Sequence, residues 1–385
     1  MATKPAAPFV FGRVADKANF VDRDAERQRL ADNFRSLTNT AIISPRRWGK
    51  SSLVRRVADD LADDKSLRLC LIDMYDVRSE ADFYSHLADG VMRATMTKWD
   101  EWVEATHRFL TQLRPTVSIS PGPMQSVSFD VDWQQAALNP DEVLDLAQNI
   151  AADKRIKLVI CVDEFQCIAG FPDAVAFQRK LRSHWQNHSR VCYCLYGSRR
   201  HMLVDIFSNP DLPFYRFGDV LVLGKIDNAI WGDFISRRFT ETGKTCTSEL
   251  GRRIAALVDN HSYYVQQLAQ QTWFRTTSIA TDAIADAALA DLTSQLSLVF
   301  TTITDSLTSR QLGFLRAAID GEPAPSSQRA LRTYGLGTSA NVTRIKEALV
   351  NREIIDVNGT ATEILDPLFK NWLATTYFAR RPGVA

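Results

Sequence analysis

Nine consecutive residues, Ser44-Pro45-Arg46-Arg47-Trp48-Gly49-Lys50-Ser51-Ser52, constrain this chain more than any other stretch. The short, β-branched run Thr40–Ile43 before them predicts a buried strand. The run 51–61 after them has apolar residues at helical spacing. A strand, a tight loop ending in Gly-Lys-Ser and a helix together form the setting of a phosphate-binding loop. The spacing departs from the general motif at Ser44, where the motif has glycine.

The residue types in this loop suit the binding of a nucleoside triphosphate, and we assign all nine to that role. Gly49 lets the backbone approach phosphate oxygens because it has no Cβ. The loop N–H groups and the positive end of the following helix dipole face an anion. Lys50 places a charge on the β- and γ-phosphates, and the Ser51 hydroxyl can ligate Mg²⁺. The alternative is an arginine-rich loop before an ordinary helix.

A second informative stretch is Lys157-Leu158-Val159-Ile160-Cys161-Val162-Asp163-Glu164. Its five central apolar residues predict a buried parallel strand, and two carboxylates follow at the C-terminal end. Ligands bind at that end of the strands in open α/β sheets. Asp163 is placed to hold Mg²⁺ through water, and Glu164 is placed to polarise an attacking water. The alternative is a strand that ends in Asp-Glu without a functional reason.

Two more candidate residues adjoin predicted strands. Ser198 follows the apolar run Val191–Tyr196, where a polar side chain can contact the γ-phosphate or the attacking water. A helix-capping role for Ser198 is the alternative. Arg216 stands immediately before the last predicted core strand, at 219–223.

Charge and apolar patterning limit the partners of the whole chain. The formal net charge is +1, so contact with nucleic acid must come from a local patch. No apolar run approaches the roughly 20 residues that cross a bilayer. The segment 1–5 lacks the apolar core of a signal peptide. We therefore expect a cytoplasmic protein with no membrane partner.

The cysteines and histidines give no metal or redox signal. Cys70, Cys161, Cys192 and Cys194 occur in apolar, strand-like runs, where a free cysteine behaves as a small hydrophobe. No pair of cysteines has C-x-x-C spacing. The pair His184/His188 has helical spacing, but no third ligand is evident nearby. We expect two exposed histidines on a helix.

The pattern along the chain predicts an α/β fold followed by two smaller domains. Residues 1–225 form a P-loop core, a parallel sheet with helices on both faces and a β-hairpin insertion near 114–133. Residues 226–306 form an all-helical lid of three or four helices. Residues 307–385 contain helices and a short hairpin turning at 358–359, which is the order of elements in a winged helix.

Several local elements are expected within the P-loop core. A helix with Leu30 and Phe34 on one face is expected to begin with Asp24 as its cap. Further helices are expected over 80–113, 141–152 and 173–187.

On these motifs the chain resembles the archaeal and bacterial AAA+-related ATPases of the STAND class, over nearly its whole length. The resemblance rests on the segments 20–26, 45–53, 162–165, 197–198 and 366–369. A non-glycine start of the loop followed by Pro-Arg-Arg is typical of that family. The family arrangement implies an ATPase core with Walker A and Walker B motifs, a helical lid and a C-terminal winged helix.

The resemblance also implies particular residue roles. Arg216 resembles the AAA+ arginine finger, which stabilises phosphoryl-transfer charge in a neighbouring subunit. Family members often carry Gly-x-Pro at the lid helix that touches the nucleotide. The matching stretch here, 260–264, departs from that pattern, so no lid residue is assigned. ATP and Mg²⁺ are the implied ligands.

Three functions follow as hypotheses. The first is an ATP-binding, slowly ATP-hydrolysing switch whose nucleotide state controls domain arrangement, assembly or partner binding. The second is a DNA-binding ATPase or regulatory factor that presents Arg344 and Lys346 to a groove, although the basic excess in its winged helix is small. The third, a non-hydrolysing scaffold, is disfavoured by the presence of both motifs. Expected partners are ATP or ADP, further copies of the chain, and DNA or a protein at the winged helix.

Overall fold

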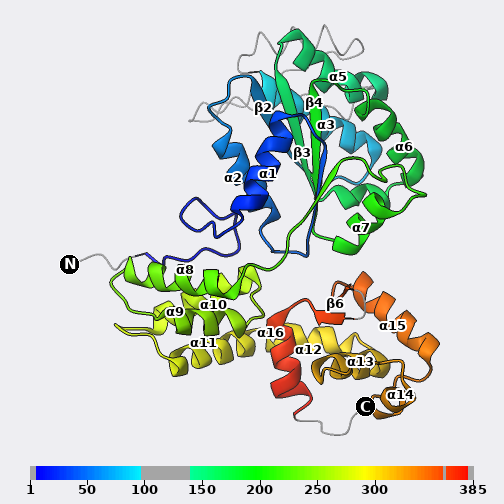
Figure 1. Cartoon of the computed structure of the whole chain (residues 1–385). Helices are drawn as coiled ribbons and strands as arrows, with labels where there is room; N and C mark the ends of the chain where they lie inside the picture. Colours follow the sequence, from blue (N-terminus) through cyan, green and yellow to red (C-terminus); the bar gives the residue numbers. More distant parts are fainter. Residues whose placement is uncertain (1–5, 97–138, 359–360, 380–385) are drawn as a thin grey trace, which may run out of the picture. The chain divides into compact units, whose positions relative to one another are not determined.

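The computed structural model describes residues 6–96, 139–358 and 361–379 (Figure 1). The chain divides into two compact units. The first, here called the sheet unit, comprises Arg23–Arg46 and Lys50–Gly224. The second, here called the helical unit, comprises Met1–Asp22, Arg47–Gly49 and Lys225–Ala385. The predicted hairpin near 114–133 and the predicted helix beyond residue 96 lie outside the described residues.

A five-stranded parallel sheet forms the centre of the sheet unit, in the order β2-β3-β4-β1-β5. Its strands are β1 (Thr40–Ile43), β2 (Leu67–Asp73), β3 (Lys157–Asp163), β4 (Val191–Tyr196) and β5 (Asp219–Val222). β1, β3 and β4 are apolar almost throughout and buried, as strands covered on both faces must be. The predicted parallel α/β core is confirmed. Because β4 lies between β3 and β1, the segments that follow these three strands leave the sheet at one edge.

Helices flank this sheet on both sides (Figure 1). In chain order they are α1 (Asp24–Arg35), α2 (Lys50–Asp60), α3 (Glu80–Thr95), α5 (Pro140–Asp153), the 3₁₀ helix η1 (Phe165–Gly170), α6 (Ala174–Trp185) and α7 (Arg200–Ser208). Leu30 and Phe34 are buried on α1 as predicted, but Asp24 is not its cap. The N-cap is Arg23, in a left-handed conformation and without a side-chain cap, so Asp24 is the first helical residue. There it forms an ion pair of 3.2 Å with Arg27.

An aromatic cluster fixes the segment that follows β3. Phe165 is fully buried and packs against Phe214, with ring centroids 5.3 Å apart, and against Phe207 at 6.1 Å. Trp185 stacks on Tyr193 with centroids 3.9 Å apart. Aromatic packing of this kind adds to the stability that simple burial provides. It anchors the chain directly after the two carboxylates at the end of β3.

The four cysteines that were predicted to lie in buried strands, Cys70, Cys161, Cys192 and Cys194, are buried.

The helical unit contains five helices between 228 and 305, more than the three or four expected. They are α8 (Asn228–Thr240), α9 (Ser248–Ala256), α10 (Ser262–Arg275), α11 (Asp282–Gln295) and α12 (Ser297–Asp305). The extra break lies between α11 and α12, where the sequence has no glycine or proline to signal it. No single described helix is long and apolar enough to cross a membrane, and α11 with α12 meets those criteria only as a pair bent by 50°.

The winged-helix elements follow in the same unit. They are α13 (Ser309–Ile319), α14 (Gln328–Thr333), α15 (Ser339–Asn351), β6 (Ile355–Asn358), β7 (Ala361–Ile364), α16 (Pro367–Trp372) and the π-helical turn η2 (Leu373–Tyr377). β6 and β7 pair antiparallel, with Ile355 opposite Ile364, so the predicted hairpin is confirmed. Asp366 caps α16 by accepting hydrogen bonds from the backbone of Leu368 and Phe369, and its other oxygen accepts one from Tyr264 of α10.

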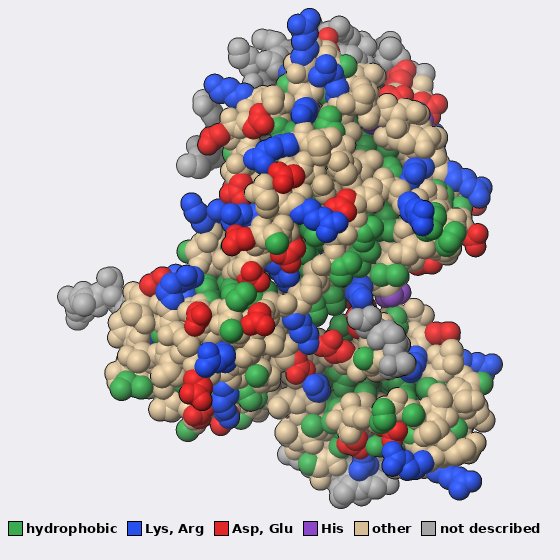
Figure 2. All heavy atoms as spheres, viewed as in Figure 1, with side chains coloured by type: hydrophobic (Ala, Val, Ile, Leu, Met, Phe, Trp, Pro, Cys, Tyr) green, Lys and Arg blue, Asp and Glu red, His purple; other side chains and the backbone are tan. Residues whose placement is uncertain are grey.

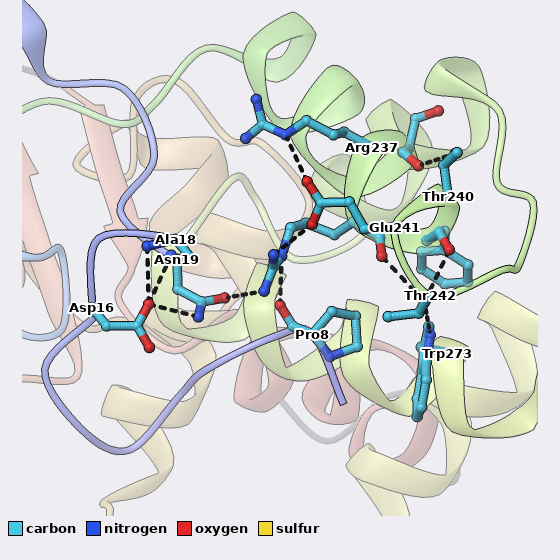
Figure 3. Close-up of polar contacts among 12 residues, drawn as sticks. Pro8, Asp16, Ala18, Asn19, Arg237, Thr240, Glu241, Thr242 and Trp273 are labelled. Carbon is cyan, nitrogen blue, oxygen red and sulfur yellow. Dashed lines mark hydrogen bonds and ion pairs between the residues drawn. The ribbon is translucent and has the colours of Figure 1, made fainter. Parts of the chain in front are cut away.

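The N-terminal segment is held against α8 (Figure 3). It is also held against α10. Arg238 donates to the carbonyl of Pro8 at 2.7 Å, and Gln266 donates to the carbonyl of Asn19 at 3.1 Å. Asp16 closes the intervening turn by accepting from the backbone of Asn19 at 3.0 Å. Phe9 is buried between Phe234 and Phe239. The first described residues are thus part of the core of the helical unit.

Candidate nucleotide site

The loop between β1 and α2 is arranged around Lys50. The Lys50 ammonium is buried and donates to the carbonyl oxygens of Ser44 and Pro45, at 3.0 and 2.8 Å, and to the Ser44 hydroxyl at 3.2 Å. Ser44 is fully buried and does not need the left-handed backbone that favours glycine. The positive φ angles of the loop occur at Arg47 (64°) and Gly49 (94°) instead. Serine at position 44 is therefore compatible with the loop, whereas glycine is required at position 49.

The tip of the loop, Arg47–Gly49, belongs to the helical unit. The Arg47 guanidinium lies 4.5 Å from the ring centroid of Tyr263, a cation–π distance. The rings of Trp48 and His261 meet edge to face, with centroids 6.3 Å apart. No motif in the sequence predicted these contacts with the segment 260–264. Arg46, at the end of the sheet unit's part of the loop, is exposed.

Ser51 and Asp163 meet at the first turn of α2. The Ser51 hydroxyl donates to Asp163 Oδ2 at 2.7 Å. Burial raises the pKa of Asp163, the Ser51 hydrogen bond opposes the shift, and the negative charge of Glu164 adds to it. Ser52 follows on the same turn and is half-buried. The hydroxyl and carboxylate oxygens together are a donor set that suits Mg²⁺, which takes few protein ligands and keeps several waters.

Glu164 lies beside Ser198, across from the end of β4. Its Oε2 accepts hydrogen bonds from the Ser198 hydroxyl at 2.8 Å and from the Ser198 backbone at 3.2 Å. Glu164 itself has a left-handed backbone, with φ of 55°. Ser198 does not cap α7, whose N-cap is Arg199 without a side-chain bond, so the alternative of a capping role is wrong.

Gln166 is a site residue that the sequence analysis missed. Its side-chain amide also donates to Glu164 Oε2. The residue is only 3% exposed, and its Oε1 has no hydrogen-bond partner in the part of the chain that the structure describes. The sequence did contain a signal for it, because Gln166 is a polar residue two positions after Glu164 in an otherwise apolar segment.

Arg216 is exposed just before β5, with φ of 51°. Its guanidinium lies 5.1 Å from the ring centroid of the neighbouring Tyr215. Among the described residues, no carboxylate lies within ion-pair distance of Arg216. The described residues therefore give Arg216 no salt bridge that would hold the last strand in place.

The prediction of two exposed helical histidines is wrong. α6 ends before His188, whose side chain is 3% exposed. Asp145 of α5 lies between the two rings, 2.8 Å from His184 Nδ1 and 3.2 Å from His188 Nε2. Tyr193 binds the other nitrogen of His188 at 2.8 Å. Burial lowers the pKa of His188 although Asp145 opposes the shift. Among the described residues, no three or more His, Cys, Asp or Glu side chains are grouped so that they could hold a metal ion.

Solved structures resemble the chain over nearly its whole length. The Walker-type ATPase PABY2304 of Pyrococcus abyssi has a TM-score of 0.66 at 16% identity, covering 93% of this chain and 97% of that one. The ORC2 protein of Aeropyrum pernix, solved as ADPNP and ADP complexes, has a TM-score of 0.53 at 14% identity, covering 96% and 99%.

A family model for a probable winged helix domain matches residues 298–375. No curated protein matches the chain. The fold is therefore that of a P-loop ATPase like these archaeal proteins, with a parallel five-stranded sheet, a helical region and a C-terminal winged-helix domain.

Proposed function

We propose that this protein is an ATP-binding, slowly ATP-hydrolysing switch of the AAA+/STAND type. One observation carries the proposal: Lys50, Ser51, Asp163, Glu164 and Ser198 gather where β1, β3 and β4 end. The segment after β1 supplies the phosphate-binding cation Lys50 and the Ser51 hydroxyl. The end of β3 supplies Asp163 for Mg²⁺ and Glu164 to act on water, and the segment after β4 supplies Ser198. The ADPNP and ADP bound to the Aeropyrum ORC2 protein support the choice of nucleotide.

The residues present fit a magnesium nucleotide. The Lys50 ammonium donates to two carbonyl oxygens of its own loop, which hold its positive charge within the loop. The N–H groups that begin α2 add to the positive field. Ser51 and Asp163 would hold Mg²⁺, the latter through water, and the ion would neutralise charge on the β- and γ-phosphates.

In hydrolysis, Glu164 would orient the attacking water and accept its proton. The water oxygen bonds to the γ-phosphorus while the bond from that phosphorus to the β–γ bridging oxygen breaks, which gives ADP, phosphate and a proton. Ser198 would hold both Glu164 and the water. Arg216, exposed and without an ion pair among the described residues, would act on the nucleotide of a neighbouring copy.

Replacing the proposed base tests the proposal. Glu164→Gln should keep ATP and Mg²⁺ binding but reduce turnover to a small residual rate, because an amide cannot accept the proton of water. Glu249→Gln, at an exposed position on α9, is the matched control and should hydrolyse ATP as the wild type does. Turnover at the wild-type rate in Glu164→Gln would remove Glu164 from this role, and absence of turnover in the wild type would refute hydrolysis.

The alternative of a DNA-binding ATPase rests on α15, the helix that a winged helix offers to a groove. Arg344 is exposed there, but Lys346 is half-buried with its ammonium 5.9 Å from the ring centroid of Phe314. Basic and acidic side chains are interspersed over the viewed face of each unit (Figure 2). We therefore place DNA binding second.

A further inference from the structure

The two carboxylate oxygens of Glu164 have different surroundings. Oε2 accepts three hydrogen bonds, from the Ser198 hydroxyl, the Ser198 backbone N–H and the Gln166 amide. Oε1 has no hydrogen bond to any residue that the structure describes. Three donors on one oxygen fix the orientation of the whole carboxylate. They leave Oε1 as the oxygen that can bind a water.

Gln166 is an unusual residue to bury at this place. It is 3% exposed, and its own Oε1 is left without a partner among the described residues. An unsatisfied buried polar atom costs free energy, and an apolar side chain of the same size would avoid that cost. The hydrogen bond that its amide donates to Glu164 is the contact that an apolar residue could not provide.

Gly197, which directly follows the neighbouring strand β4, leaves the space that the Gln166 side chain occupies. A Cβ at position 197 would lie 1.8 Å from Gln166 Oε1 and 3.1 Å from the Glu164 Cα. Contacts under 3.0 Å force a neighbour to shift. The end of β4 therefore provides a donor pair at Ser198 and, one residue earlier, the space that Gln166 occupies.

We propose that Gln166 is a positioning residue for Glu164. Together with Ser198 it occupies Oε2, so that Oε1 is presented to the attacking water in the orientation needed for proton transfer. This inference rests on the proposed ATPase function. Gln166 touches neither substrate nor water in it and acts only through Glu164.

The test replaces Gln166 by an apolar residue of similar length. Gln166→Met should lower kcat for ATP by about 10- to 100-fold, the effect of losing a hydrogen bond to a charged group, while affinity for a fluorescent ATP analogue stays unchanged. Gln178→Met is the matched control. Gln178 of α6 is also 3% exposed with an unpartnered Oε1, but it makes no described contact with Glu164, so its replacement should leave kcat unchanged.

A double-mutant cycle separates positioning from a general packing effect. In the Glu164→Gln background, adding Gln166→Met should cause no further loss of the residual rate, because both act through one carboxylate. Equal losses in both backgrounds would overturn the proposal. Gly197→Ala gives a second approach if Gln166→Met folds poorly, since its methyl group would displace the Gln166 amide and should give the same loss of kcat.

The outcomes distinguish the two proposals. If the wild type hydrolyses ATP and Glu164→Gln does so only at a small residual rate, but Gln166→Met and Gly197→Ala both turn over at the wild-type rate, the positioning role alone is refuted. If the wild type does not hydrolyse ATP, or Glu164→Gln remains fully active, the proposed function fails and the role of Gln166 fails with it.

Discussion

Ser51 and Asp163 are 112 positions apart in the chain, and a hydrogen bond of 2.7 Å joins the Ser51 hydroxyl to Asp163 Oδ2. The contact connects the first turn of α2 to the end of β3, two strands away from β1 in the sheet. It brings together one neutral and one acidic oxygen donor. Predictions for metal binding, nucleotide binding and turnover follow from this site.

The first prediction concerns Mg²⁺. Asp163→Asn should weaken Mg²⁺ binding about 10- to 100-fold, as expected for a carboxylate that holds the ion through water. ATP binding in the presence of EDTA should not change, because Lys50 and the loop N–H groups remain. Titrating Mg²⁺ into protein with a fluorescent ATP analogue measures both. Asp173→Asn, exposed before α6, is the control, and an unaltered Mg²⁺ affinity in Asp163→Asn would exclude the assignment.

The second prediction concerns Lys50. Lys50→Ala should bind ATP about 10- to 100-fold more weakly, because the phosphates lose a charged hydrogen bond worth about 1.5–3 kcal/mol. Circular dichroism should show that the fold is retained. The exposed Lys65→Ala serves as the control. Equal affinities of Lys50→Ala and wild type would argue against a phosphate-binding loop.

The third prediction concerns Arg216. Arg216→Ala should bind ATP normally and hydrolyse it about 10³- to 10⁵-fold more slowly, because the developing phosphoryl charge loses a cation. Mixing it with Lys50→Ala should partly restore turnover, since one copy supplies an intact pocket and the other the arginine. Arg179→Ala, exposed on α6, is the control. Turnover independent of protein concentration, without rescue on mixing, would show that Arg216 does not act on a neighbouring copy.

The fourth prediction concerns pH and stability. Burial lowers the pKa of His188 in the folded protein, so the neutral ring is favoured there. Its contribution to stability is present above the unfolded pKa of about 6.5 and is lost as the pH falls through the lower folded value. Melting temperatures between about pH 7.5 and 5 should fall less steeply for His188→Gln than for the wild type. Parallel profiles for the two proteins would contradict this account.

Asp145 also makes the folded protein less stable as the pH falls, but in a lower pH range than His188. Its burial raises its pKa, but the hydrogen bonds from His184 and His188 outweigh burial and lower the pKa overall. A lowered carboxyl pKa contributes stability above its unfolded value, which is lost as the pH falls through the folded value. Asp145→Asn should therefore reduce the loss of stability in the acid range below about pH 4.

The fifth prediction concerns the winged helix. If α15 binds duplex DNA, charge reversal at Arg344 and Lys346 should abolish binding, and the wild-type affinity should fall steeply with salt. Fluorescence anisotropy with a labelled duplex at several salt concentrations measures both, with Lys17→Glu as an exposed control. No binding by the wild type at low salt would eliminate the DNA hypothesis and leave the winged helix as a module for packing or for a protein partner.

The sequence by itself determined the elements whose signals are local. Apolar runs identified β1, β3, β4 and β5 of the sheet, and the loop and carboxylate motifs followed β1 and β3 as predicted. Asn358-Gly359 identified the β6–β7 hairpin. These features were predictable because the spacing of apolar residues, the residue types in turns and the polar residues after strands are all visible in a short stretch of sequence.

Only the tertiary structure decided which distant residues meet. Gln166 belongs to the site because Gly197 and Ser198 follow β4, the strand adjacent to β3. No local sequence pattern predicts the order of strands in a sheet. Asp145 binds both His184 and His188 because α5 and α6 lie side by side. Hydrogen bonds between segments depend on topology and register, whereas apolar period and turn chemistry are properties of a short stretch of chain.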